Sequence, residues 1–328
     1  MNSSIKRIKA ARARTHWQQR HSYEREYKNA DESEWAALLS GTAHISQGTR
    51  DAMMSEEALE QDGTSVPGAS YMQREGVDEG LQASVREIVE ERIELLGATG
   101  YPFSLDNNSL VFSGDFDHPY IALLTICNLP SLSKAPFNSA AVAFEYLSLI
   151  AAQSFLGEKS HGWRFGWPRD NDQDLKIKDA AAKLGVRAGG HLGEWDWVPA
   201  AYLPDDPSTK SLKDAGLDFV AWVPWADGGP AQLQLVGQCA CGEDWKLKTH
   251  DLRLEKLGQW MRVPSPPPVR ALFTPRHTPY PSIHYKASEA GLIFDRIRMV
   301  HALMATSTVQ RKASRFVKRI VALGTVKP

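Results

Sequence analysis

Residues 214–238, with the sequence DAGLDFVAWVPWADGGPAQLQLVGQ, contain the most informative pattern in the chain. The segment Phe219–Val223 is short and apolar, which is typical of a buried strand. A strong turn signal follows at residues 227–230 (DGGP). Residues 232–238 then alternate polar and apolar side chains, the period of a strand. We therefore expect a β-hairpin whose first strand is opened by Asp218.

Helical patterns precede this hairpin. Residues 140–156 are apolar on almost every side, which indicates a buried helix, and they contain one acid, Glu145. Residues 81–96 repeat apolar side chains at spacings of three and four, the pattern of an amphipathic helix, and Gly97 is well placed to end it. The apolar run at 120–128 is compatible with a helix or a strand. Helices and strands in this order predict a mixed α/β protein.

The chain divides into three predicted segments. Residues 1–80 form a helical or loosely ordered N-terminal extension, because large apolar residues become rare after about residue 40. Residues 81–262 form an α/β core with its leading helices. Residues 263–328 form a C-terminal helical extension, in which 288–305 and 308–323 are the expected helices.

Composition is that of a globular protein, with 42% hydrophobic and 23% charged residues in a chain of 328. The net charge of −1 excludes a general polycation. Basic residues nevertheless gather near both ends. Residues 6–14 hold five of them and no acid, and a second group lies near the C-terminus: Arg311, Lys312, Arg315, Lys318, Arg319 and Lys327. These groups are compatible with an anionic polymer as partner and equally with solvated helix faces.

Cysteine usage indicates a reducing compartment. Cys127, Cys239 and Cys241 are too few for a disulfide framework, and their spacing is not that of a zinc site. The N-terminus has no apolar segment of the signal-peptide type, and we expect no membrane-spanning helix. The chain is therefore predicted to be cytoplasmic and to have no membrane partner.

Five residues form a constellation suited to phosphodiester chemistry. Asp218 opens the first strand, Gln238 ends the second beside it, and Glu145 lies on the buried helix upstream; Lys246 and Lys248 begin a predicted helix over 244–257. Carboxylate and amide oxygens are suitable ligands for Mg²⁺. A bound metal activates water and neutralises charge on the transition state, and a nearby lysine adds positive charge.

The order of these residues resembles a family pattern. A helix with an embedded Phe144-Glu145, a strand opened by Gly216-Leu217-Asp218 and a strand ending in Gln238 look like the PD-(D/E)XK, or restriction-endonuclease-like, superfamily, closest to its Mrr-like and defence-associated branches. The resemblance implies an α/β fold with an αβββαβ core, and DNA cleavage that depends on Mg²⁺ or Mn²⁺. It also implies that Asp218, Glu145 and Gln238 bind the metal.

The chain departs from this pattern at the lysine. The family places a lysine two residues after position 238, where this chain has Ala240. Lys248 is the first substitute and Lys246 the second. Each position also has a plain structural interpretation: Glu145 as a hydrogen-bonded buried acid, Asp218 as a strand-opening residue and Gln238 as a strand-end amide.

The predicted function is that of a metal-dependent DNA nuclease, or a nuclease subunit, in a bacterial anti-phage defence system. No P-loop is present, so we expect control by other protein subunits, such as an ATPase or a sensor. The alternative is a catalytically inactive scaffold or adaptor subunit of a defence complex, which Ala240 favours. A third hypothesis, a metabolic α/β enzyme, predicts a closed apolar pocket and no open basic groove.

Overall fold

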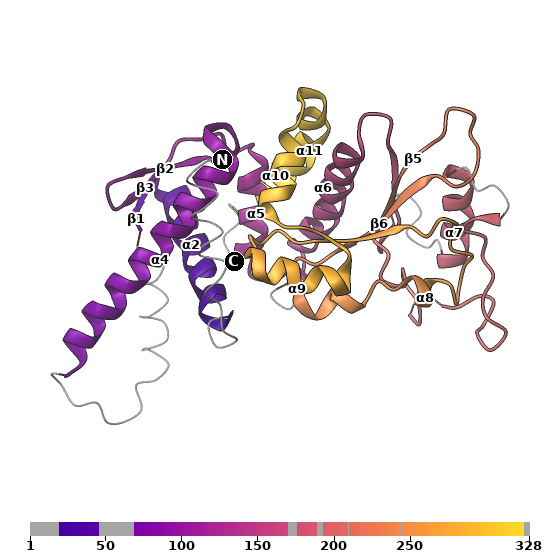
Figure 1. Ribbon diagram of the computed structural model, residues 1–328, viewed down its shortest axis with the longest axis horizontal. Helices are drawn as coiled ribbons and strands as arrows, with labels where there is room; N and C mark the ends of the chain where they lie inside the picture. The colour runs from indigo at the N-terminus through magenta and orange to yellow at the C-terminus, as the bar shows by residue number, and fades with distance from the viewer. Residues whose placement is uncertain are drawn as a thin grey trace.

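A mixed five-stranded sheet forms the centre of the fold (Figure 1). The computed structural model describes residues 20–45, 69–169, 176–188, 193–208, 210–242 and 245–324. In spatial order the strands are β4 (His161–Arg164), β5 (Phe219–Val223), β6 (Leu233–Cys239), β7 (Val269–Phe273) and β8 (Leu292–Phe294). Pairs β4–β5 and β5–β6 are antiparallel, whereas β6–β7 and β7–β8 are parallel.

The β5–β6 pair is the hairpin that the sequence predicts, with Phe219 opposite Gly237. A Cβ at position 237 would lie 2.2 Å from Cζ of Phe219, so this position needs glycine. The missing side chain lets the Phe219 ring lie over β6 and contact Phe273 of β7, with ring centroids 5.1 Å apart. Gly237 therefore leaves room for the Phe219 ring on the inner face of the sheet.

Helices cover both faces of the sheet. The helix α6 (Asn138–Leu156) packs on β4, β5 and β6, and α10 (Arg296–Met304) and α11 (Ser307–Gly324) pack on α6. The opposite face is covered by α7 (Ile177–Arg187), α8 (Leu254–Leu257) and α9 (Tyr280–Ala290). The result is a three-layer α/β arrangement, and the predicted α/β class is confirmed at this level.

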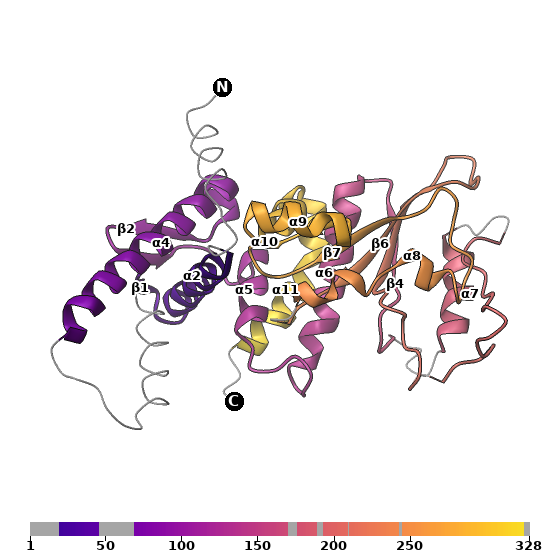
Figure 2. The same cartoon turned by 60° about the horizontal axis from the view of Figure 1, so that its bottom comes forward.

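Over the described residues, the N-terminal part adds three helices and a small sheet. The elements are α2 (Arg20–Ser40), β1 (Thr42–His44), α4 (Ala69–Gly100), β2 (Phe103–Asp106), β3 (Ser109–Phe112) and α5 (Pro119–Asn128). Figure 2 shows α2 and α4 side by side at one end of the molecule, with α7 at the other. Buried residues of α2 and α4 belong to the same apolar cluster as those of α5, α6 and α11, so this part shares the main core.

Several elements differ from the sequence expectations. The run at 120–128, which the sequence leaves open between helix and strand, is helical and lies in α5, whose residues 119–126 are buried. The predicted helix over 288–305 is interrupted at Gly291, where φ is 83° and a Cβ would lie 2.2 Å from Arg270 O; β8 follows. The predicted C-terminal helical extension thus also supplies β7 and β8.

Two further expectations need comment. The segment predicted as a helix over 244–257 contains the 3₁₀ helix η3 (Trp245–His250) and the short α8. The basic run at residues 6–14 lies outside the described residues.

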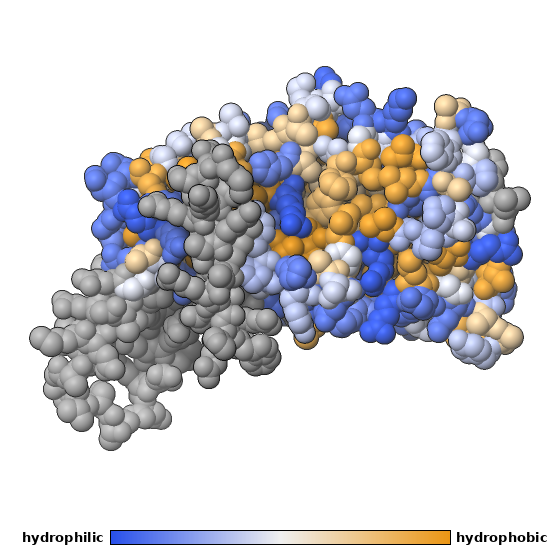
Figure 3. Space-filling model, viewed as in Figure 1, coloured by the Kyte–Doolittle hydropathy of each residue, from blue (hydrophilic) through white to orange (hydrophobic). Residues whose placement is uncertain are grey.

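The helix α6 is long and apolar enough to cross a membrane by length and composition alone. Half of it is buried inside the fold, as in the core helix of a soluble protein. An apolar surface lies over the region between α11 and the hairpin (Figure 3). Phe155, near the end of α6, is 59% exposed, although its ring contacts Phe294 edge-on.

Candidate metal and catalytic site

Asp218 lies where the ends of three strands meet. Its backbone N–H donates to Gly237 O at 2.9 Å, and its backbone oxygen accepts from the N–H groups of Phe165 (2.7 Å) and Gly166 (2.8 Å). The side-chain Oδ2 accepts a hydrogen bond from Cys239 N–H at 2.6 Å. The backbone of β5, the end of β4 and the end of β6 therefore hold this carboxylate in one position.

Glu145 reaches the same place from α6. It is buried, and its Oε2 lies 2.6 Å from Nε of Arg164, the last residue of β4. A Cβ built on Gly166 would lie 2.5 Å from Glu145 Oε2 and 3.1 Å from Asp218 Oδ1. The two carboxylates thus converge on the open side of a glycine, and the structure brings together the two acids that the sequence predicts.

The pKa values of both carboxylates are raised. Burial, and then the negative charge of Asp214, raise the pKa of Asp218 to about 7. Burial, and then the charge of Asp218, raise the pKa of Glu145, while Arg164 acts in the opposite direction. Two acids close together in a partly dry site cannot both ionise easily, so the pair is stabilised by any added positive charge.

The donor set fits a hard divalent cation. Mg²⁺ is commonly bound through one or two carboxylates, with water and phosphate oxygens completing its shell. Gly166 carries no side chain that would occupy the point on which Glu145 and Asp218 converge. Over the part of the chain that the structure describes, no group of three or more His, Cys, Asp or Glu residues has metal-site geometry. The candidate site therefore offers two protein ligands.

Gln238 has a different environment. Continuing the hairpin register by one step sets it across from Asp218. It is buried, and its partner in β7 is Leu272, which packs in the apolar cluster beneath α9. This cluster lies on the sheet face opposite α6. Gln238 is therefore next to Asp218 in the sheet, but it lies against the layer that contains α9. Glu145 approaches Asp218 from the opposite layer, which contains α6.

The two candidate lysines lie on η3 and act on different groups. The positive charge of Lys248 lowers the pKa of Asp218, opposing the effect of burial. Burial lowers the pKa of Lys246, and the neighbouring charges of Lys286 and Arg276 add to this effect. The charge of Lys248 thus acts on Asp218, whereas Lys246 is repelled by Lys286 and Arg276. Ala240, at the family's lysine position, is fully buried beneath α9.

Sequence reasoning missed Arg164 and Gly166. Both lie in the segment 161–169 (HGWRFGWPR), whose aromatic residues dominate its pattern. Arg164 also lies over the ring of Tyr146, with its Cζ 5.6 Å from the ring centroid. An arginine and a glycine at the end of a short strand are the signal that could have identified this segment.

Cys239 and Cys241 border the carboxylates. Burial, and then the negative charges of Asp218 and Glu145, raise the pKa of both thiols. In the absence of added positive charge the thiols therefore keep their protons at neutral pH and contribute packing.

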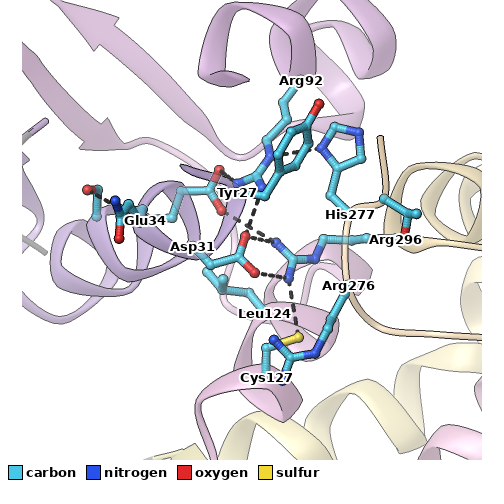
Figure 4. Close-up of polar contacts among 12 residues, drawn as sticks. Tyr27, Asp31, Glu34, Arg92, Leu124, Cys127, Arg276, His277 and Arg296 are labelled. Atoms are coloured by element: carbon cyan, nitrogen blue, oxygen red, sulfur yellow. Dashed lines mark hydrogen bonds and ion pairs between the residues drawn. The ribbon is translucent and has the colours of Figure 1, made fainter. Parts of the chain in front are cut away.

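A second polar cluster, the α2 ion network, joins distant parts of the chain (Figure 4). It consists of Asp31 and Glu34 of α2, Arg92 of α4 and Arg296 of α10. Arg296 binds both oxygens of Asp31 at 2.7 Å, and Arg92 binds Asp31 at 2.8 Å and Glu34 at 2.6 Å. All four residues are buried, and their charges balance. Hydroxyl groups of Tyr101 and Tyr120 donate to Glu34.

The α2 ion network differs from the carboxylate pair in its balance of charge. Burial alone would raise the pKa of Asp31, but the charges of Arg296 and Arg92 outweigh it and hold the pKa at about 2. Buried ion pairs whose charges are balanced hold the helices that carry them in a fixed orientation. We therefore assign it a structural role and the Glu145–Asp218 pair the candidate chemistry.

In comparisons with known proteins, no protein-family model, curated protein or solved structure matches the chain.

Proposed function

We propose that the chain is a metal-dependent DNA nuclease, or the nuclease subunit of a bacterial anti-phage defence system, built on a restriction-endonuclease-like core. The observation that carries the proposal is the convergence of Glu145 and Asp218 on Gly166. Support also comes from the order of the elements, which run α6, β4, α7, β5, β6, η3, α8, β7 and match the αβββαβ order of the resemblance when α7 and η3 are treated as insertions.

In this proposal each residue has a defined task. Asp218 and Glu145 hold Mg²⁺ or Mn²⁺, and Arg164 orients Glu145 through the 2.6 Å ion pair. The cation, when bound, makes a water more acidic and neutralises charge on the phosphate. Lys248 adds positive charge beside the carboxylates. The water oxygen bonds to phosphorus as an ester P–O bond breaks, and the leaving oxygen takes up a proton.

The cellular setting belongs to the same proposal. We place the protein in the cytoplasm, where three free cysteines stay reduced, and expect partner subunits to supply targeting or ATP-driven control. The second candidate function is a catalytically inactive scaffold in such a complex. It is favoured by one observation, the buried Ala240 at the family's lysine position.

A cleavage assay separates the two functions. Plasmid and single-stranded DNA are incubated with purified protein in Mg²⁺, Mn²⁺ or EDTA, and Asp218→Asn is compared with Asp227→Asn. Asp227 lies in the exposed turn of the same hairpin, so its variant is a matched control. Metal-dependent cleavage that is lost only in Asp218→Asn supports the nuclease.

A scaffold would cleave no DNA under any of these conditions. Metal binding is then tested separately through the melting temperature. If Asp218 and Glu145 bind Mg²⁺, 5 mM Mg²⁺ raises the Tm of the wild type at pH 8 and leaves that of Asp218→Asn unchanged. Equal Tm values with and without Mg²⁺ or Mn²⁺ in the wild type would contradict the metal site.

A further inference from the structure

The helix α11 presents one basic face and one buried face. Its apolar side packs against α5 and α6 through Ala313, Phe316, Val317 and Ile320. At 3.6 residues per turn the opposite side carries five exposed cations and no acid of the same helix. We call these residues the α11 basic face: Arg311, Lys312, Arg315, Lys318 and Arg319.

The electrostatics of this face are those of a surface for a polyanion. Arg311, Arg315 and Arg319 recur every fourth residue and span about 12 Å along the helix. Cations at this spacing repel one another, which is unfavourable for the isolated helix. Lys318 lies at the edge and forms an exposed ion pair with Asp117 at 3.1 Å. The packing of α11 is achieved by its apolar side, so the repeated charge serves something outside the fold.

Side-chain contacts connect this face to the candidate site. The guanidinium of Arg315 lies over the ring of Phe316, 4.4 Å from its centroid. Phe316 stacks on Tyr146 of α6, with centroids 4.5 Å apart and planes at 11°. Arg164 lies over the ring of Tyr146 and also forms the ion pair with Glu145. The basic face thus borders the helix from which Glu145 reaches the carboxylate pair.

We propose that the α11 basic face binds the phosphate backbone of duplex DNA and so holds it beside the Glu145–Asp218 site. The choice of DNA among polyanions rests on the proposed function, but the binding itself does not require cleavage. Arginine is suited to phosphate because its planar guanidinium donates two parallel hydrogen bonds. Contacts of this kind position DNA without specifying its sequence.

The test measures binding of a fluorescein-labelled 30-base-pair duplex by anisotropy in EDTA, at NaCl concentrations from 50 to 200 mM. The variant Arg311→Gln/Arg315→Gln/Arg319→Gln should bind at least tenfold more weakly at 100 mM NaCl. The slope of log K against log[NaCl] should fall by about 2–3, because each neutralised phosphate contact contributes ~0.9.

Two further variants keep the outcome interpretable. Lys176→Gln/Lys178→Gln/Lys183→Gln removes the same charge from α7 and its N-cap, on the opposite face of the sheet, and should bind DNA within twofold of the wild type. Arg311→Lys/Arg315→Lys/Arg319→Lys keeps the charge of α11 and should restore most of the affinity. Each variant is compared with the wild type by thermal unfolding, so a folding defect is recognised.

Equal DNA affinity and salt slope in the wild type and the α11 glutamine variant would overturn the inference. So would equal losses in the α7 and α11 variants, or α11-dependent binding to phosphatidylserine vesicles without binding to DNA. Failure of the proposed function is distinguishable: if the wild type cleaves nothing with Mg²⁺ or Mn²⁺ while DNA binding still depends on α11, the nuclease fails and the DNA surface stands.

Discussion

Gly166 determines how closely Glu145 and Asp218 can approach each other. A methyl group there would lie 2.5 Å from Glu145 Oε2 and 3.0 Å from its Cδ, well inside contact distance. Because Arg164 and the β4–β5 backbone hold both acids, the conflict must be relieved by moving one of them. The absence of a side chain at position 166 therefore allows the two acids to approach each other.

We predict that Gly166→Ala abolishes metal-dependent cleavage and lowers the free energy of unfolding by ~1–3 kcal/mol, the usual cost of overpacking. Urea unfolding and the cleavage assay measure the two effects. The control is Gly80→Ala, at an exposed position of α4 with no atom within 4 Å of the added methyl. That variant should keep wild-type activity and unfold at an equal or slightly higher urea concentration. Full activity in Gly166→Ala would contradict the site.

The raised pKa of Asp218 makes a prediction about pH. Its pKa rises from 3.8 to about 7 on folding, so the folded state binds the proton more tightly. This contribution to stability is complete below about pH 4 and is lost as the pH rises toward 7 and above. Asp218→Asn has no such loss, so its Tm relative to the wild type should increase between pH 5 and pH 8.

Thermal unfolding of both proteins in EDTA across this pH range measures the effect, and Asp227→Asn is the control. We expect a relative gain of ~1–3 kcal/mol for Asp218→Asn between pH 5 and pH 8, since one pKa unit corresponds to about 1.4 kcal/mol and part of the shift from 3.8 to about 7 is already expressed at pH 5. A difference that does not change with pH would mean that Asp218 is ionised at pH 5, contrary to its environment.

At the scale of the element, η3 separates two lysines that the sequence treats as alternatives. Lys248 acts on the charge of Asp218, whereas Lys246 lies with Arg276 and Lys286. A 3₁₀ helix has three residues per turn, so residues two positions apart point in different directions. The packing of η3 against α9 then determines which lysine places its charge where it acts on Asp218.

We predict that Lys248→Ala lowers the cleavage rate at least 100-fold, whereas Lys246→Ala lowers it less than tenfold, in line with the usual contribution of a single charge-stabilising group. Single-turnover cleavage at saturating Mg²⁺ measures both. Lys248→Ala should also move the pH dependence of cleavage to higher pH, because the pKa of Asp218 rises when the positive charge is removed. The opposite ranking of the two variants would assign the role to Lys246.

At the scale of the whole molecule, the α2 ion network connects the N-terminal helices to the C-terminal part. Asp31 and Arg296 lie 265 positions apart in the chain and form a bidentate pair. Removing one partner leaves buried arginines without compensation, which is strongly unfavourable. Because α10 also packs on α6, this network bears on the layer that carries Glu145.

We predict that Asp31→Asn lowers the free energy of unfolding by ~3–5 kcal/mol. The surface variant Asp106→Asn is the control and should change it by less than 0.5 kcal/mol. The pKa of Asp31 lies at about 2, below its ordinary 3.8, so this contribution is complete above about pH 4 and is lost as the pH falls toward 2. Urea unfolding at pH 7 measures the effect. Equal free energies of unfolding for the two variants would mean that the α2 ion network does not stabilise the fold.

The sequence by itself determined the elements whose patterns are local. The hairpin, with a turn signal between two strands, and the buried helix α6 follow from periodicity and turn chemistry, and both are present. Asp218 and Glu145 also stand out in the sequence, because acids next to apolar segments are costly without partners. These inferences need only the nearest neighbours along the chain.

The remaining features depend on contacts between elements. The packing of the layers resolves 120–128 as a helix rather than a strand, and α9 ends at Gly291, where the chain approaches Arg270 closely before β8. The ion pair of Glu145 with Arg164, the gap at Gly166 and the bidentate pair across the α2 ion network each join residues from different elements. Local patterns specify which face of an element is apolar, but contacts between faces arise only when the layers pack together.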